Sequence, residues 1–220
     1  MITAGPVMPN SAARASSANG IVKRRACGGG GVRVVAILAL LVAGCVGPAD
    51  TPPSGGAGEA PTAPGAFVLS SAAFEDGGAI PEEHTCDGCQ ASPPLAFSGA
   101  PAGTGTFALL VIDSDVPTPQ TPLREVVHWL VWDVTVVAGG AEFPPDALPA
   151  GAVEGEQGWR GPCPPLGSPA HRYVFAAHAV DGVLGLAEGS SRADLERALE
   201  GRSLAEARLV GLYTRALPGS

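Results

Sequence analysis

VIDSDVPTPQTPLREVVHWLVW, residues 111–132, is the stretch that decides the fold and the chemistry of this chain. An apolar run ends in Asp113 and Asp115, three prolines follow, and a second apolar run carries His128. Proline fixes φ and removes a backbone donor, so the three prolines predict a loop between two strands. The stretch therefore predicts two buried strands that deliver acidic and imidazole side chains to their ends.

A second stretch of the same kind is GPCPPLGSPAHRYVF, residues 161–175, in which a proline-rich turn again leads a histidine into an apolar run. His171 and Tyr173 stand two positions apart, so their side chains share one face of an extended segment. We expect the two stretches to meet around one pocket, with Asp113, Asp115, His128, His171 and Tyr173 in its wall.

The other apolar segments are short and are separated by Gly and Pro, which is typical of an all-β sandwich. A capping-box pattern at Ser191 and Asp194 predicts a short helix that stops at Gly201, and residues 203–206 repeat the pattern for a second helix. The fold class is therefore all-β, with a few short helices near the C-terminus. Strands are predicted over residues 67–69, 95–97, 107–112, 126–134, 172–180 and 209–213.

Simple alternation assigns the faces of the strand around His128. It places His128 with Leu130, Trp132 and Val134 on one face of the sheet. The opposite face then receives the residues between them, which are Val127, Trp129, Val131 and Asp133.

The N-terminal section has the pattern of an export signal. A basic region, residues 23–33, precedes the nine apolar residues 34–42 and then Ala43-Gly44-Cys45. Nine residues are too few to span a bilayer, which needs roughly 20. The sequence VAGC resembles the bacterial lipoprotein signal, in which the cysteine is lipidated and becomes the new N-terminus. A plain secretory signal that ends near a cysteine is the alternative.

The lipoprotein interpretation predicts how the chain is divided into segments. Residues 1–44 are the signal peptide, and Cys45 carries the lipid, typically palmitate, that anchors the protein in a membrane. Residues 45–65 are a Gly/Pro-rich tether without large apolar side chains, residues 66–216 are the folded domain, and 217–220 are a tail. We expect the bacterial cell envelope as the location, with the domain facing the periplasm or the exterior.

Charge excludes one class of partner. Five of the 13 basic residues precede Cys45 and all 21 acidic residues follow it, which leaves 8 against 21, a net charge of −13. Nucleic-acid binding depends on Lys and Arg contacts to phosphate, so we expect no nucleic-acid partner. Any bound anion needs a local pocket rather than a general positive field.

Three cysteines, Cys86, Cys89 and Cys163, remain in the exported part, where disulfides persist. Cys86 and Cys89 have CxxC spacing, but a structural zinc site needs four ligands and no second such motif follows. We predict a structural disulfide from Cys86 or Cys89 to Cys163, and no metal or cofactor.

Each candidate side chain also has a purely structural explanation. Two aspartates before a proline are typical of turns, and a lone histidine in an apolar strand is typical of a core. Arg124 and Arg172 are best explained by salt bridges within the domain. The combination is more informative, because one protonated histidine in a partly buried pocket would hold a phosphate or carboxylate group.

Six motifs occur in a fixed order along residues 67–215, and together they resemble the phosphatidylethanolamine-binding protein family, in particular its bacterial Raf-kinase-inhibitor-like branch. The motifs are SPPL (92–95), PAGT (101–104), DSDVP (113–117), REVVHW (124–129), GPCPP (161–165) and HRYVF (171–175).

This resemblance implies a β-sandwich with Greek-key character and an anion pocket for phosphate-like groups, including phosphorylated head groups or side chains. It implies a binding or regulatory protein rather than an enzyme; inhibition of a partner enzyme, or hydrolysis by the same Asp/His set, are the alternatives. Ser114 and Val116 depart from the usual DPDAP, and the loop 154–160 is short, which leaves the size of the ligand open. By motif, the pocket residues are Asp113, Asp115, Pro117, His128, His171 and Tyr173.

Overall fold

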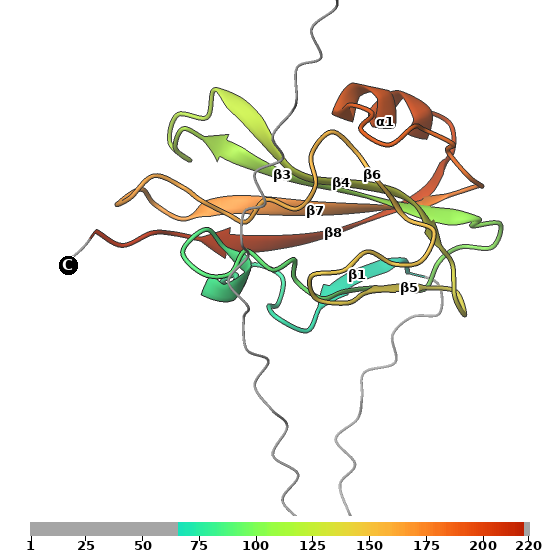
Figure 1. The fold of residues 1–220 in the computed structure, drawn as a ribbon, viewed down its shortest axis with the longest axis horizontal. Helices are drawn as coiled ribbons and strands as arrows, with labels where there is room; N and C mark the ends of the chain where they lie inside the picture. The colour runs from blue at the N-terminus through green and yellow to red at the C-terminus, as the bar shows by residue number, and fades with distance from the viewer. Residues whose placement is uncertain (1–65, 218–220) are drawn as a thin grey trace, which may run out of the picture.

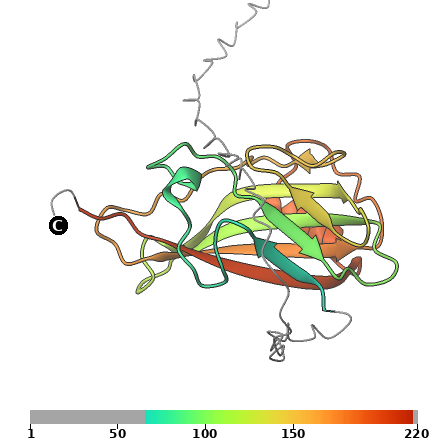
Figure 2. The ribbon, with the colours of Figure 1, turned by 90° about the horizontal axis from the view of Figure 1, so that it is seen from below.

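Two sheets packed face to face form the body of residues 66–217, which are the residues that the computed structural model describes (Figure 1). Seen from below, the three short strands of the smaller sheet lie across the longer strands of the larger one (Figure 2). The all-β sandwich expected from the sequence is confirmed. The predicted signal peptide, the predicted lipidation site Cys45, the predicted tether and residues 218–220 lie outside the described part of the chain.

The strand pairings within both sheets are antiparallel. The smaller sheet has the order β1-β2-β5, and the larger one has the order β6-β4-β3-β7-β8. The smaller sheet consists of β1 (Val68–Ser71), β2 (Leu95–Ser98) and β5 (Ala141–Phe143). The larger sheet consists of β3 (Thr106–Val116), β4 (Arg124–Thr135), β6 (Val153–Glu154), β7 (His171–Val180) and β8 (Ser203–Tyr213).

Both faces of the larger sheet are covered, which explains the unbroken apolar runs in its central strands. One face packs on the smaller sheet through a cluster that includes Phe107, Trp129 and Phe175. The other face carries a second cluster, in which Leu130 and Trp132 pack with Leu195. The sequence did not predict the short strands β5 and β6, because two or three residues carry no alternation signal.

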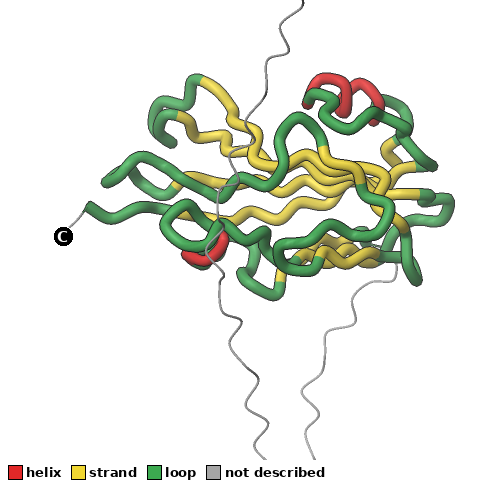
Figure 3. Tube along the Cα trace, in the orientation of Figure 1, coloured by secondary structure: helices red, strands yellow, loops and turns green. Residues whose placement is uncertain are grey.

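The predicted helix is confirmed as α1 (Arg192–Leu199), which lies above the larger sheet (Figure 3). Ser191 accepts a hydrogen bond from the backbone of Asp194, whose side chain accepts one from the backbone of Ser191 in return. Gly201, with φ of 70°, follows the helix end. A 3-10 turn, η1 (Glu82–His84), belongs to the first part of the domain in sequence and not to its C-terminal part. No helix among residues 66–217 is long and apolar enough to cross a membrane.

The second predicted helix, residues 203–206, is wrong, because these residues begin β8. Strand β8 pairs with β7 from Ser203 to Tyr213, and its Ala207 and Leu209 join the core between the sheets. The backbone hydrogen bonds and the burial gained along β7 outweigh a weak capping signal at Ser203.

The faces that alternation assigned around His128 are also partly wrong. Val111 pairs with Trp129 and Ile112 pairs with Val127, so His128 is an extra residue in β4, a β-bulge. As a result Val127 packs with the second cluster on the same side as Leu130. A second irregularity, at Asp133 with φ of 56°, places Val134 in the core between the sheets instead.

Gly211 in β8 is required by close packing. A Cβ atom at this position would lie 2.5 Å from Cγ1 of Ile80 and 2.9 Å from a ring carbon of Phe74. We expect Gly211→Ala to lower the free energy of unfolding by about 1–3 kcal/mol, because two core side chains must shift. Denaturant unfolding measures this, with Gly182→Ala as the control, since that Cβ meets only the end of the Arg202 side chain, at 3.4 Å. Equal stability of the two variants would contradict the packing argument.

Candidate functional site

A buried hydrogen bond between neighbouring strands lies at the centre of the site. Asp113 in β3 stands opposite Tyr173 in β7, and its Oδ2 lies 2.8 Å from Nδ1 of His171. The other oxygen, Oδ1, accepts a hydrogen bond from the backbone of Asp115 at 2.8 Å. An ionised carboxylate only accepts, so Nδ1 of His171 donates and Nε2 is left to face another group.

The second aspartate has a different partner from the one expected. Asp115 is fully buried, and its carboxylate accepts hydrogen bonds from the backbone N, Nε and Nη2 of Arg172 at 2.6–2.9 Å. These bonds hold the pKa of Asp115 below its usual value and raise that of Arg172. The predicted salt bridge of Arg172 is confirmed. Of the two aspartates, only Asp113 makes a hydrogen bond to a histidine ring.

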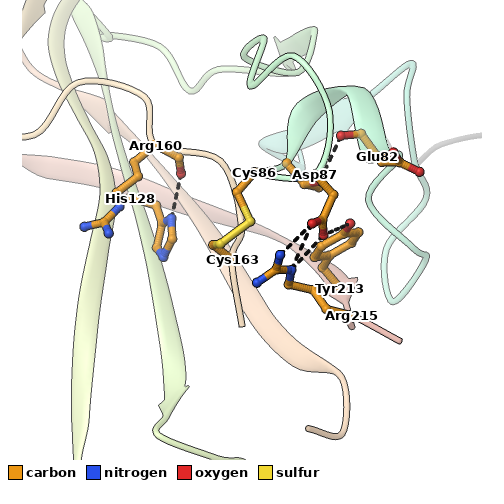
Figure 4. Close-up of a disulfide and its surroundings, with 9 residues drawn as sticks. Glu82, Cys86, Asp87, His128, Arg160, Cys163, Tyr213 and Arg215 are labelled. Atoms are coloured by element: carbon orange, nitrogen blue, oxygen red, sulfur yellow. Dashed lines mark hydrogen bonds and ion pairs between the residues drawn. A yellow bond between two sulfur atoms is a disulfide. The ribbon is translucent and has the colours of Figure 1, made fainter. Parts of the chain in front are cut away.

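His128 is held from the other side, by a main-chain group. Its Nδ1 lies 2.6 Å from the carbonyl oxygen of Arg160, which can only accept, so Nδ1 donates (Figure 4). Its ring meets the ring of Tyr173 edge-on, with centroids 5.1 Å apart. Burial, only partly opposed by the Arg160 carbonyl, lowers the pKa of His128 and favours the neutral ring.

Nε2 of His171 is buried and makes no hydrogen bond to the described residues. The hydroxyl of Tyr173 is also buried; it lies within reach of the Asp113 carboxylate and the backbone of Cys163 but makes no hydrogen bond of regular geometry to them. Burial and the nearby charge of Asp113 raise the pKa of Tyr173, so the phenol stays protonated and can donate. An unpaired buried polar group costs about 1–3 kcal/mol. A polar ligand that forms a hydrogen bond with such an atom removes this cost and therefore binds more tightly.

A disulfide fixes the loop that carries the acceptor of His128. Cys163 is bonded to Cys86, which settles which of the two candidates, Cys86 and Cys89, pairs with it (Figure 4). The backbone of Cys86 also donates to the carbonyl of Pro162 at 3.0 Å. Residues 160–163 are therefore cross-linked to the segment after η1, beside the ion pair of Arg215 with Asp87.

The structure thus brings four of the predicted residues into one cluster. Contacts link Asp113, His171, Tyr173 and His128, while Asp115 lies behind them with Arg172. Pro117 is exposed and follows Val116, at the end of β3, through a cis peptide bond.

Arg160 was not a predicted site residue, although its position directly before GPCPP was an available signal. Arg124, for which the sequence predicted a salt bridge, has none within residues 66–217.

The four clustered side chains are almost completely buried, and two concavities of the surface lie away from them. An apolar groove of about 1200 Å³ runs beside β2 and β5, and a polar cavity of about 290 Å³ is lined by Trp129, Glu154 and Trp159. A ligand that reaches Nε2 of His171 therefore requires the flanking loops to move. The loops that border the cluster are residues 117–123 and 161–170.

Comparison with known proteins gives a consistent result. The family model described as phosphatidylethanolamine-binding protein matches residues 70–214. A UPF0098 protein of Methanothermobacter thermautotrophicus is 42% identical over 155 residues, which are 67% of this chain and 98% of the relative.

Two crystal structures are similar to this fold. One is a putative phosphatidylethanolamine-binding protein homologue from Chlamydia trachomatis, with 36% identity and a TM-score of 0.61 over 68% of this chain and 98% of that one. The other is YbcL of E. coli, described as a new member of the mammalian PEBP family, with 30% identity and a TM-score of 0.60 over 67% and 98%.

Asp115→Asn tests the structural role of the second aspartate. We expect it to cost about 1–3 kcal/mol of unfolding free energy at neutral pH, because the buried acceptor of Arg172 loses its charge. The pKa of Asp115 is lowered from 3.8, so its contribution is present above that pH and is lost as the pH falls below it. Denaturant unfolding at neutral and acidic pH measures both effects.

Asp181→Asn, which breaks an exposed ion pair with Arg202, is the matched control and should cost less than about 0.5 kcal/mol. An equal loss in the two variants at neutral pH would contradict the role given to Asp115.

Proposed function

The chain belongs to the phosphatidylethanolamine-binding protein family, and we propose from this premise that it is a non-enzymatic binding protein for a small anion or phosphoryl group. The ligand would be a phosphorylated head group or a phosphorylated side chain. The observation that carries the proposal is the His171 ring, whose Nδ1 is fixed by Asp113 and whose Nε2 is buried and unpaired within residues 66–217. Asp113, Asp115, Pro117, His128, His171 and Tyr173 would form the site.

The tautomers indicate how an anion would be held. In its neutral form His171 has no hydrogen on Nε2, because Nδ1 donates to Asp113. A second proton turns Nε2 into a donor, and the resulting charge forms an ion pair with Asp113 at 2.8 Å. The anion would then accept from Nε2 of His171, which otherwise has no partner within residues 66–217, and from the Tyr173 hydroxyl.

The ionisable groups beside His171 are paired or neutral. Asp113 lies directly against His171, Tyr173 stays protonated, and the Asp115–Arg172 pair behind them is neutral overall. Because burial holds the pKa of His128 below its usual value, this second ring adds a donor only in acidic solution. Anion affinity is therefore expected to rise as the pH falls, since protonation of His128 adds a positive donor beside the site.

Sulfate is a suitable probe, because its charge is constant across this range. We expect the wild-type protein to bind sulfate more tightly in acidic solution than in neutral solution, where burial keeps the ring of His128 neutral. His171→Ala should weaken binding by about tenfold or more, because the ring that donates to the anion is gone. Titration calorimetry measures both quantities.

His178→Ala, on the same strand but at its far end, is the control for loss of a histidine and should bind as the wild type does. Equal sulfate affinity of the wild-type and His171→Ala proteins would overturn the proposed role of the His171 ring.

We also propose that the protein is anchored in the bacterial cell envelope through a lipid on Cys45. The signal pattern before Cys45 supports this. The domain, with a net charge of −13 after Cys45, gains no membrane affinity from its charge, so attachment would rest on the lipid. Residues 45–65 would connect the lipid to the domain that begins near Ala66.

Cys45→Ser tests the anchor. In a bacterium fed an alkyne-tagged fatty acid, the wild-type protein should carry the tag and fractionate with membranes, whereas the variant should do neither, because it lacks the thiol that accepts the lipid. Cys89→Ser controls for the loss of a cysteine and should keep the tag. A tag that persists on the Cys45→Ser protein would disprove the assignment.

A further inference from the structure

The arginines of the domain divide into two groups. Residues 66–217 contain eight arginines and no lysine, and six of the arginines form ion pairs with carboxylates in that part of the chain. The six are Arg172, Arg192, Arg197, Arg202, Arg208 and Arg215. In a domain with so large an acidic excess, a positive charge without a carboxylate partner is unusual, and Arg124 and Arg160 are the two such residues within the described range.

Both residues lie at the candidate site. Arg160 provides the carbonyl that holds His128, and its side chain runs alongside the His128 ring (Figure 4). The guanidinium charge contributes to the lowered pKa of His128, as expected of a cation close to an imidazole. Arg124 begins β4 opposite Val116, at the sheet end where Asp113 and His171 meet. Both arginines are exposed.

The charges inside the site cancel in pairs. Arg172 balances Asp115, and a protonated His171 balances Asp113. Burial keeps His128 neutral. The two exposed arginines are then positive charges without a carboxylate partner within residues 66–217, and together they match an anion that carries two negative charges.

We propose, on the basis of the anion-binding function given above, that Arg124 and Arg160 form a cationic rim that selects a phosphate monoester dianion over a phosphate diester. A monoester carries about −1.5 to −2 charges at neutral pH and offers three oxygens. A diester, the form of phosphate in a phospholipid, carries a single charge and has two of its oxygens blocked. Guanidinium groups suit the monoester because they donate in a planar fork to two oxygens at once.

Methyl phosphate and dimethyl phosphate separate the two ligand classes. At pH near 7 we expect the wild-type protein to bind methyl phosphate about tenfold or more tightly than dimethyl phosphate. Arg160→Gln should weaken methyl phosphate binding about fivefold and change dimethyl phosphate binding less than about twofold, with Arg124→Gln acting in the same direction. Both substitutions are at exposed side chains, and the carbonyl that holds His128 is retained.

Arg197→Gln is the matched control. It removes one positive charge from α1, on the outer face of the larger sheet, and should leave both affinities within about twofold of the wild type. The readout is the ratio of the two dissociation constants from titration calorimetry.

Three outcomes would overturn the inference. If the wild-type protein binds both esters equally, or if Arg160→Gln keeps the wild-type ratio, the rim does not select charge, while the anion site itself stands. If the wild-type protein binds neither ester, the proposed function fails and the inference fails with it.

Discussion

The pairing of β3 with β7 is the constraint on which the rest of the structure depends. These strands keep an unbroken register from Thr106 opposite Val180 to Asp113 opposite Tyr173. A shift of one residue would turn every side chain of one strand to the wrong face, so the buried core on both sides fixes the register. That register brings Asp113 to His171 and Asp115 to Arg172, across about 57 positions of sequence.

The interior of this sheet end contains an unusual number of ionisable groups for a buried region. A buried charge is tolerated when it is paired and hydrogen-bonded, and each aspartate here meets that condition. Asp115 accepts three hydrogen bonds from Arg172, and these give it a structural role. Asp113 holds only one nitrogen of the His171 ring, so the other nitrogen, Nε2, stays unpaired. The two neighbouring aspartates therefore differ in role: Asp115 stabilises the fold, and Asp113 orients a side chain that could bind a ligand.

Sequence patterns predicted the long elements of the fold because their signals are physical and local. The apolar runs before Asp113 and after Arg124 are buried on both faces, and the capping residues of α1 satisfy its first turn. The bulge at His128 could not be read, since an extra residue in one strand is defined only by its partner strand. The helix predicted at Ser203 failed for the same reason, because pairing with β7 decides that segment.

The candidate site, like the fold, could be predicted from the sequence only in part. Asp113, His128, His171 and Tyr173 were predictable as a group because strand ends beside proline-rich loops gather side chains. The hydrogen-bond partner of each of these side chains could not be predicted. The acceptor of His128 is the main-chain carbonyl of Arg160, and a backbone group cannot be recognised from residue types.

The disulfide between Cys86 and Cys163 affects the stage of folding at which the candidate site is complete. It closes a loop of 77 residues and fastens the segment that supplies the carbonyl for His128. In a chain whose thiols are still reduced, that segment is held by backbone hydrogen bonds, among them those from Arg160 to His128 and from Cys86 to Pro162, without the covalent bond. If the protein is exported as we propose, the Arg160 carbonyl would gain its full constraint only with oxidative folding, and copies kept among cytosolic reductants would bind less well.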